Sequence, residues 1–172
     1  MRLFVAVNFN DTTRGQLTTL IDGLRPHSSR GRFTIPDNLH LTLAFLGECD
    51  AKQASAIKTA MGKIDFEAFP IKIERVGRFK RNGGDIWWAG VQDSKALSSL
   101  YEDLKDKLLH VGFALDERKY SPHITLGREI ETDVLPWRLA PFGETVESIE
   151  LMKSERINGK LTYTPIYSKP AL

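Results

Sequence analysis

The sequence predicts a fold that mixes strands and helices, in which one strand–helix–strand order is used twice. Short apolar alternations typical of strands are separated by segments with apolar residues three and four positions apart, which is typical of helices. The chain has 172 residues, 41% of them hydrophobic and 27% charged, as in an ordinary globular protein of about one domain. This composition argues against disorder, collagen and coiled coil, and no apolar run approaches the ~20 residues of a membrane span.

The first half of the chain contains three predicted strands and two predicted helices. The strands are expected at residues 2–9, 38–47 and 69–76, and the second helix at residues 51–63. The first helix is expected to start from a cap at Asp11 or Thr12 and to end at Pro26, before a polar loop at residues 27–32. Its apolar face carries Leu17, Leu20, Ile21 and Leu24.

The second half begins again in the same way. A Gly83-Gly84 turn predicts a hairpin, and a strand follows at residues 86–91. The next helix has an apolar face and is stopped by Gly112. That face carries Leu97, Leu100, Tyr101, Leu104 and Leu108. Further strands are expected at residues 120–127, 147–153 and 161–166, the last after an Asn158-Gly159 turn.

One tetrapeptide pattern occurs in both halves. His40-Leu41-Thr42-Leu43 lies in a predicted strand of the first half, and His123-Ile124-Thr125-Leu126 lies 83 residues later in the matching strand. Residues i and i+2 of a strand point to one face, so each strand presents an imidazole beside a hydroxyl and turns its apolar residues to a core. If the halves pack as pseudo-symmetric lobes, both pairs face one cleft.

Two histidines at one cleft are suited to general acid–base chemistry. Imidazole titrates near pH ~6.5, so one ring can accept a proton from a nucleophile while the other donates a proton to a leaving group. Threonine hydroxyls can hold the nonbridging oxygens of a phosphoryl group. Metal binding is the competing use of histidine, but the carboxylate and cysteine ligands that usually complete a metal site are near neither motif. The residues therefore favour phosphoryl chemistry with no metal and no cofactor.

The net charge and the cysteine content indicate which partners and which cellular location to expect. The net charge of +2 does not indicate a protein that coats duplex nucleic acid, but two basic clusters, Arg30–Arg32 and Arg78–Arg81, could guide an RNA strand or remain solvated loops. The single cysteine, Cys49, forms no internal disulfide and is expected to be passive. A cytoplasmic, monomeric protein is expected.

The paired motifs resemble those of the 2H phosphoesterase superfamily, and within it the RNA 2′,3′-cyclic phosphodiesterases, also called 2′-5′ RNA ligases. The resemblance covers nearly the whole chain, and the two histidine segments are its most specific part. It rests on residues 2–7, 38–47, 87–91, 121–128 and 154–156 and on Gly159 and Tyr163.

The resemblance implies an α+β, bilobal fold, with two pseudo-symmetric antiparallel sheets and outer helices around a central cleft. Residues 1–172 would form a single 2H phosphoesterase domain of two intertwined lobes. The substrate would be RNA or an oligonucleotide, tRNA halves included, with a terminal 2′,3′-cyclic phosphate that is hydrolysed to a 2′-phosphomonoester. The reverse reaction, with an RNA 5′-hydroxyl in place of water, would be ATP-independent 2′-5′ ligation.

The resemblance also implies a role for each site residue. His40 would be the general acid that protonates the leaving 3′ oxygen, and His123 the general base that activates water. Thr42 and Thr125 would hold the phosphate oxygens. Arg128 matches a basic position of the family pattern and could clamp a phosphate. Strict strand alternation points Arg128 away from His123, so this role requires a bend near Gly127.

Several neighbours have both a packing and a binding interpretation. Phe33 could stack on a base or pack at the rim, and Tyr120 could line the cleft or pack, with packing slightly favoured. Of the adjacent Trp87 and Trp88, one must face outward from the other. The remaining histidines, His27 in a loop and His110 at a helix end, are expected to be bystanders.

Two other functions fit the same residues. The enzyme could act on a small cyclic nucleotide rather than on RNA, or the fold could serve as a noncatalytic RNA- or nucleotide-binding module. Retention of both histidines argues against the noncatalytic module, and the basic clusters favour RNA.

Overall fold

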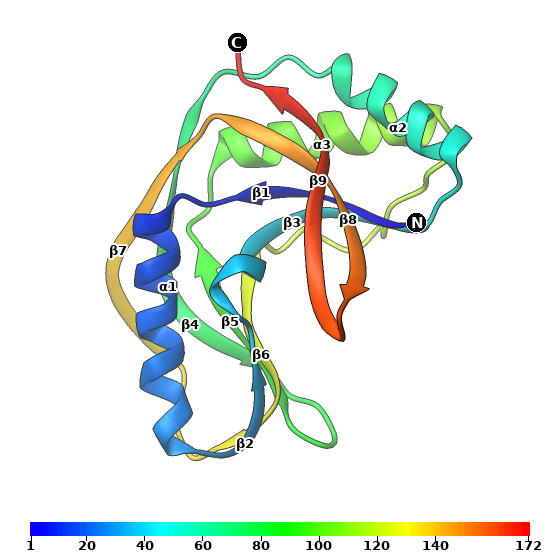
Figure 1. The fold of residues 1–172 in the computed structure, drawn as a ribbon. Helices are drawn as coiled ribbons and strands as arrows, with labels where there is room; N and C mark the ends of the chain where they lie inside the picture. Colours follow the sequence, from blue (N-terminus) through cyan, green and yellow to red (C-terminus); the bar gives the residue numbers. More distant parts are fainter.

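The computed structural model describes residues 1–172 and shows two antiparallel sheets with three longer helices (Figure 1). The helices are α1 (Asp11–Leu24), α2 (Ala51–Gly62) and α3 (Lys95–His110), with short 3-10 turns η1 (Arg25–His27) and η2 (Pro36–Asn38). The strands are β1 (Arg2–Asn8), β2 (Ser28–Phe33), β3 (His40–Glu48), β4 (Phe69–Phe79), β5 (Asp85–Val91), β6 (His123–Thr132), β7 (Trp137–Val146), β8 (Ser148–Ile157) and β9 (Lys160–Pro170).

The two sheets repeat one arrangement, which confirms the predicted pseudo-symmetric α+β fold. One sheet has the order β3-β1-β8-β9, and the other has the order β2-β6-β5-β4-β7. If the added edge strand β2 is left out, the motif strands β3 and β6 are each the first strand of their sheet, and β1 and β5 are their equivalent neighbours. Asn8 of β1 lies opposite His40, and Gly90 of β5 lies opposite His123. The halves are interleaved, because the C-terminal strands β8 and β9 complete the sheet that β1 and β3 begin.

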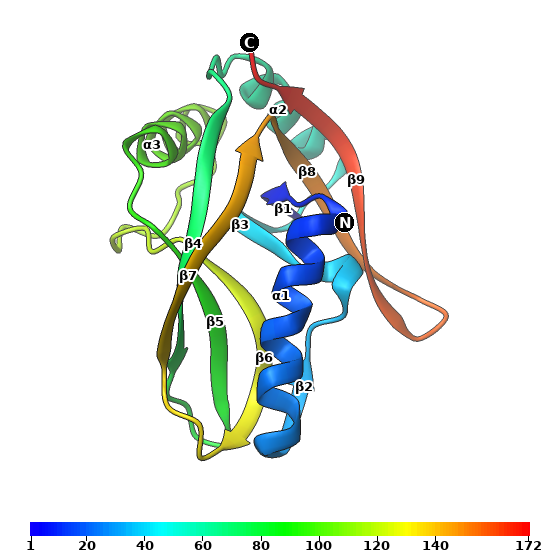
Figure 2. The same ribbon diagram turned by 90° about the vertical axis from the view of Figure 1, so that its left-hand side faces the viewer.

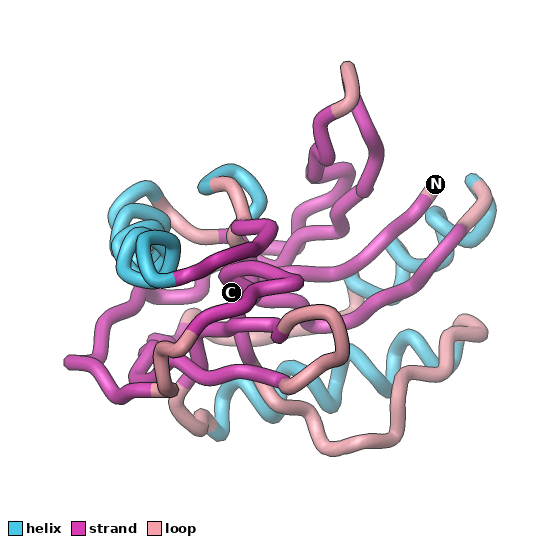
Figure 3. Tube along the Cα trace, turned by 90° about the horizontal axis from the view of Figure 1, so that it is seen from below, coloured by secondary structure: helices cyan, strands magenta, loops and turns pink.

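The helices lie at the periphery, with the strands between them (Figure 3). Helix α1 packs against β6 and β7, α3 against β4, and α2 against α3 and β9. Asn10 caps α1 by accepting the Thr13 amide hydrogen, so the predicted cap at Asp11 or Thr12 is wrong by one or two positions. Asp50 and Gln53 form a capping box at the start of α2. No helix is both long enough and apolar enough to cross a bilayer.

Motif residues of both strands contribute to one apolar core. Leu41 of β3 and Ile124 and Leu126 of β6 are fully buried, together with the predicted α1 residues Leu17 and Ile21. Burial of this one face of β3 and β6 leaves the histidines and threonines on the opposite face. The predicted alternation of both motifs is therefore confirmed.

Two strands differ from the sequence prediction. The sequence places residues 27–32 in a loop, but residues 28–33 form β2, which pairs with β6 alone. Polar residues are tolerated there because β2 is an edge strand with one face in solvent, and such a strand shows no apolar alternation. Strand β7, the opposite edge, is absent from the prediction because it contains Pro141 and Gly143, which are typical of turns. The Gly83-Gly84 and Asn158-Gly159 turns are confirmed, and the β8–β9 hairpin projects from the body of the molecule (Figure 2).

Candidate active site

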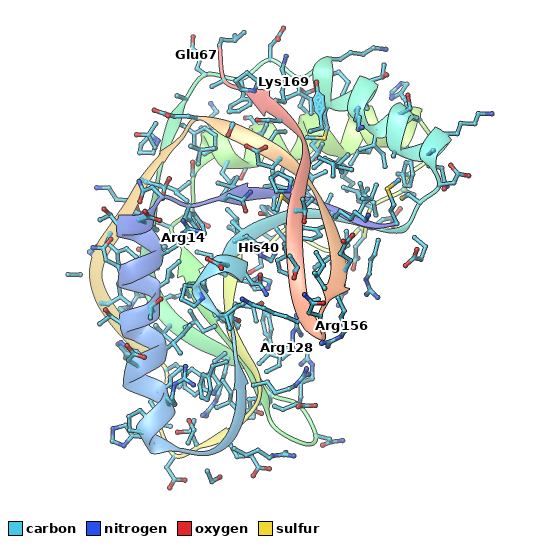
Figure 4. All side chains as sticks on the ribbon, in the orientation of Figure 1. Arg14, His40, Glu67, Arg128, Arg156 and Lys169 are labelled. Carbon is cyan, nitrogen blue, oxygen red and sulfur yellow. The ribbon has the colours of Figure 1, made fainter.

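Both predicted motifs open onto one cavity of about 640 Å³. Its walls come from β3, from β6, and from the segment that joins α3 to β6. Four of the predicted site residues, His40, Thr42, His123 and Thr125, line it together with Arg128. The structure thus places side chains from distant parts of the sequence around one space large enough for a nucleotide-sized ligand. His40 lies near the middle of the molecule, whereas Glu67 and Lys169 lie near its upper end (Figure 4).

The same backbone contact orients both imidazoles. Nδ1 of His40 lies 2.7 Å from the carbonyl oxygen of Asn38, and Nδ1 of His123 lies 2.7 Å from the carbonyl oxygen of Ser121. A carbonyl oxygen can only accept, so in each ring Nδ1 carries the hydrogen and donates it. Nε2 of each ring is therefore the atom left for proton exchange with a ligand. This contact two residues upstream is a second feature that the two motifs share.

His40 is the more enclosed of the two histidines. Its ring packs against Phe4, with centroids 4.9 Å apart, and meets Tyr163 of β9 edge-on at 5.3 Å. Nε2 lies 2.8 Å from Oγ1 of Thr42. Burial lowers the pKa of His40 below its usual value, the Asn38 carbonyl opposes this, and the charge of Arg128 lowers the pKa further. His40 is therefore neutral at pH 7 when the cavity holds no anion.

His123 has an equivalent aromatic setting on the other sheet. Phe79 meets its ring at 90° with centroids 5.2 Å apart, and Trp88 lies 6.3 Å away. Trp88 packs against Gly77, where an added Cβ would lie 2.4 Å from the indole. Glycine at this position therefore lets the indole approach the sheet closely. As predicted, the neighbouring tryptophans face apart, since Trp87 is fully buried in the core.

A β-bulge at the last residue of each motif sets the direction of the side chains that follow. Ala6 lies opposite Thr42 but Val5 lies opposite Ala44, and Trp88 lies opposite Thr125 but Trp87 lies opposite Gly127. One extra residue, Leu43 in β3 and Leu126 in β6, interrupts the alternation. Arg128 therefore returns to the cavity face, and the expectation that strict alternation points it away is wrong. The required bend is this bulge.

The basic clusters are not placed as the sequence suggested. Arg30 pairs with Glu131 at 3.0 Å and Arg32 pairs with Glu129 at 2.6 Å, outside the cavity. Arg78 donates to the carbonyl oxygen of Val134. Of the predicted clusters, only Arg81 lines the cavity.

Two further cations at the cavity were missed by the sequence reasoning. Arg118 and Lys119 lie on the segment between α3 and β6. Nε and Nη2 of Arg118 both donate to Oδ2 of Asp116, at 2.8 and 2.6 Å. Their closeness in sequence to His123 was the available signal, because a segment that leads into a motif strand ends at the site.

The remaining residues that the sequence analysis considered lie outside the cavity or are buried. Phe33 packs against the core beneath Arg25 and does not line the cavity. His27 and His110 also lie outside the cavity, as expected. Cys49 is a buried free thiol. No group of three or more His, Cys, Asp or Glu side chains is placed to hold a metal ion.

Tyr120 both lines the cavity and joins its two walls. Its hydroxyl donates to the carbonyl oxygen of Thr42 at 2.9 Å, and its ring stacks on Tyr101 of α3 with centroids 4.1 Å apart. Burial raises the pKa of Tyr120 well above its ordinary value, so the hydroxyl keeps its proton. This hydrogen bond links the segment before β6 to the backbone of β3.

Replacement of Tyr120 by phenylalanine is expected to lower the free energy of unfolding by about 1 kcal/mol, because the Thr42 carbonyl loses a partly buried donor. Urea titration followed by tryptophan fluorescence measures this change. Tyr167→Phe serves as the matched control, because the Tyr167 hydroxyl makes no hydrogen bond. Equal stability of Tyr120→Phe and the wild type would show that the cross-wall bond contributes nothing.

Comparison with known proteins agrees with this geometry. A family model described as LigT like phosphoesterase matches residues 7–88. An RNA 2′,3′-cyclic phosphodiesterase of Thermotoga maritima is 35% identical over 131 residues, which are 74% of this chain and 70% of that protein. A protein of the same description from Escherichia coli is 30% identical over 167 residues, which are 96% of this chain and 93% of that protein.

Comparison with solved structures shows that the fold of this chain is also similar to that of known proteins. The crystal structure of E. coli LigT complexed with 3′-AMP superimposes with a TM-score of 0.83 and 29% identity, covering 99% of this chain and 96% of that chain. Sequence and fold thus agree over nearly all of the chain. The chain belongs to the LigT-like phosphoesterases, within the 2H phosphoesterase superfamily that its paired motifs resemble.

Proposed function

We propose that this protein is an RNA 2′,3′-cyclic phosphodiesterase that opens a terminal 2′,3′-cyclic phosphate to a 2′-phosphomonoester. The observation that carries the proposal is the pair of histidines at one cavity, each held in the same tautomer by a carbonyl two residues upstream. Two imidazoles with available Nε2 atoms are suited to a displacement in which one proton is removed and another is supplied. The relatives described as RNA 2′,3′-cyclic phosphodiesterases support the substrate class.

The proposed reaction is one in-line displacement at phosphorus. His123 takes a proton from water at Nε2, and the water oxygen forms a bond to phosphorus. The bond from phosphorus to the 3′ oxygen breaks, and His40 donates its Nε2 proton to that oxygen. The phosphate stays on the 2′ oxygen, and each histidine then carries the opposite protonation state. Proton exchange with solvent restores both histidines.

The hydroxyls and the arginine act on the charge of the phosphate. Thr42 and Thr125 donate to the nonbridging oxygens, and Arg128 supplies a guanidinium that matches phosphate geometry. An anionic substrate beside Arg128 offsets the effect of that guanidinium on the pKa of His40. In this proposal, substrate binding therefore promotes the protonated form of His40 that a general acid requires.

RNA rather than a small cyclic nucleotide is favoured by the cations of the cavity. Arg81 and Lys119 extend the positive charge beyond Arg128, as a strand with several phosphates would require, whereas Arg118 is paired with Asp116. Reverse ligation follows when an RNA 5′-hydroxyl replaces water beside His123. The proposal treats residues 1–172 as one domain, because the two sheets share a core and their strands are interleaved. The monomeric state and the cytoplasmic location remain predictions.

One assay tests this function directly. The wild-type protein is incubated in EDTA with a short RNA that ends in a 2′,3′-cyclic phosphate, and with the corresponding mononucleoside 2′,3′-cyclic phosphate. Digestion with a 3′-phosphatase that spares 2′-phosphates identifies the product. A 2′-phosphate, with the RNA preferred, is expected. Absence of turnover on the RNA contradicts the proposal, and preference for the mononucleotide transfers it to small cyclic nucleotides. Activity that requires added metal contradicts the metal-independent mechanism.

A further inference from the structure

The alternation of β6 is interrupted a second time, directly after Arg128. Residues two apart in a regular strand point to one face, yet Arg128 lines the cavity and Ile130 is buried in the core behind the opposite face. The change of face falls on Glu129, whose φ of 54° is one of only two positive values at non-glycine residues. In β3, the positive φ beyond the motif falls on a glycine, Gly47. A glutamate in this conformation is unfavourable and must be held there by its surroundings.

Strand pairing fixes the position of this second interruption. Between paired positions, β5 supplies only Ile86 opposite Arg128 and Glu129. On the other side, β2 supplies only Gly31 opposite Glu129 and Ile130. Glu129 is thus the extra residue toward both neighbours, as in a β-bulge. Paired residues before and after it keep the bulge at this place in the strand.

Two contacts constrain the backbone of Glu129. Gly84, in the turn between β4 and β5, lies so close that a Cβ added to it would be 2.4 Å from the Glu129 carbonyl carbon. Nε of Arg32 in β2 donates to Oε2 of Glu129 at 2.6 Å, but both side chains are more than half exposed, so this ion pair contributes little. The close approach of the glycine turn is therefore the main constraint.

We propose that Glu129 and Gly84 are positioning residues, which keep Arg128 directed into the cavity through the left-handed backbone at Glu129. This inference rests on the proposed function, because it concerns the guanidinium that meets the phosphate. If Glu129 left this conformation, regular alternation would return, and Arg128 and Ile130 would point to one face. Burial of the apolar Ile130 side chain is the stronger preference, since an exposed arginine loses little by turning. Arg128 would therefore leave the cavity.

The test replaces Glu129 by residues that differ in their tolerance of positive φ. Glu129→Gly adopts this conformation without strain and is expected to keep kcat/KM within about threefold of the wild type. Glu129→Val is β-branched and disfavours it most, so kcat/KM for a terminal 2′,3′-cyclic phosphate is expected to fall about 10²-fold, as for loss of Arg128. In an Arg128→Met protein, Glu129→Val is expected to add less than about threefold, because the side chain that it misdirects is absent.

Two matched controls separate positioning from general damage. Gly83→Ala adds a side chain at a positive φ in the same turn, but its Cβ meets nothing within 4 Å, so activity should be kept. Gly84→Ala must displace the β6 backbone and should resemble Glu129→Val. Asn158→Val places valine at the other positive φ, in the β8–β9 turn outside the cavity, and should leave kcat/KM unchanged. Circular dichroism confirms that each variant is folded.

The pKa of His40 reports the position of Arg128 without any turnover. The Arg128 charge lowers that pKa, so Glu129→Val should raise it in the ligand-free protein and Glu129→Gly should not, as measured by NMR titration of the ring. This pattern supports the inference even if no cyclic phosphate is hydrolysed. The inference is overturned, even in an active enzyme, if Glu129→Val keeps the low pKa and the wild-type kcat/KM. It is also overturned if Glu129→Gly is as impaired as Glu129→Val, or if Glu129→Val slows the Arg128→Met protein as much as the wild type.

Discussion

Replacement of either His40 or His123 by alanine is expected to lower kcat/KM for a terminal 2′,3′-cyclic phosphate by about 10²–10⁴-fold, the usual contribution of a positioned acid or base. Each variant removes the only Nε2 on its wall that can exchange a proton with the reacting group. The measurement is an initial-rate assay with product identification. Because the two histidines act in one displacement, the double variant should be little slower than the worse single variant.

The chain supplies its own matched controls for this experiment. His27 and His110 lie outside the cavity, so their alanine variants should retain full activity. Circular dichroism then separates loss of chemistry from loss of fold. A His40→Ala or His123→Ala protein that keeps a wild-type rate would remove that histidine from the mechanism. Multiplicative losses in the double variant would indicate two independent contributions rather than one concerted step.

Replacement of Arg128 by methionine is expected to lower kcat/KM by about 10²-fold, as does removal of a single charge-stabilising donor in other enzymes. The same change is expected to raise the pKa of His40 in the ligand-free protein, because the Arg128 charge is one of the two influences that lower it. The sign follows from electrostatics, since removal of a nearby cation favours the imidazolium. NMR titration of the His40 ring measures the pKa, and steady-state kinetics measure the rate.

Two variants test whether the charge or the geometry of the Arg128 side chain is responsible for these two effects. Arg128→Lys keeps the cation, so the pKa of His40 should stay low while the loss of bidentate geometry still slows the reaction. Arg156→Met removes an exposed arginine near the tip of the β8–β9 hairpin, outside the cavity (Figure 4). This change should alter neither quantity. An unchanged His40 pKa in Arg128→Met would contradict the electrostatic coupling across the cavity.

The sequence alone predicts which side chains of the two motifs face the cavity. It does not predict the orientation of the side chains that follow each motif. Alternation within His40–Leu43 and His123–Leu126 correctly predicts which side chains face the cavity. It fails at Arg128, because an extra residue at Leu126 shifts the register by one, and strict alternation does not allow for that shift although Gly127 marks the place where a bend could occur. Phe45, which also lines the cavity, was overlooked for the same reason, because Leu43 is the extra residue in β3. The repeat itself was the missing clue, since the two bulges occupy equivalent positions.

Charge clusters were the least predictable feature. Arg30 and Arg32 have no acidic neighbour in the sequence, yet β2 pairs with β6 and brings Glu131 and Glu129 beside them. The partner of a surface arginine is decided by strand pairing between segments far apart in the chain, which local composition does not encode. Arg118 and Lys119 reach the cavity because the chain between α3 and β6 lies along it.

The interleaved topology also has a consequence for synthesis of the protein. The sheet that carries His40 contains β8 and β9, and Tyr163 of β9 packs on the His40 ring. During translation, His40 is made long before Tyr163, so its wall of the cavity is completed only after β8 and β9 have emerged. A chain that terminates before β9 therefore retains both motifs and lacks the sheet that supports one of them. Truncated products should be inert rather than half-active, so a damaged message yields no partly active fragment of this enzyme.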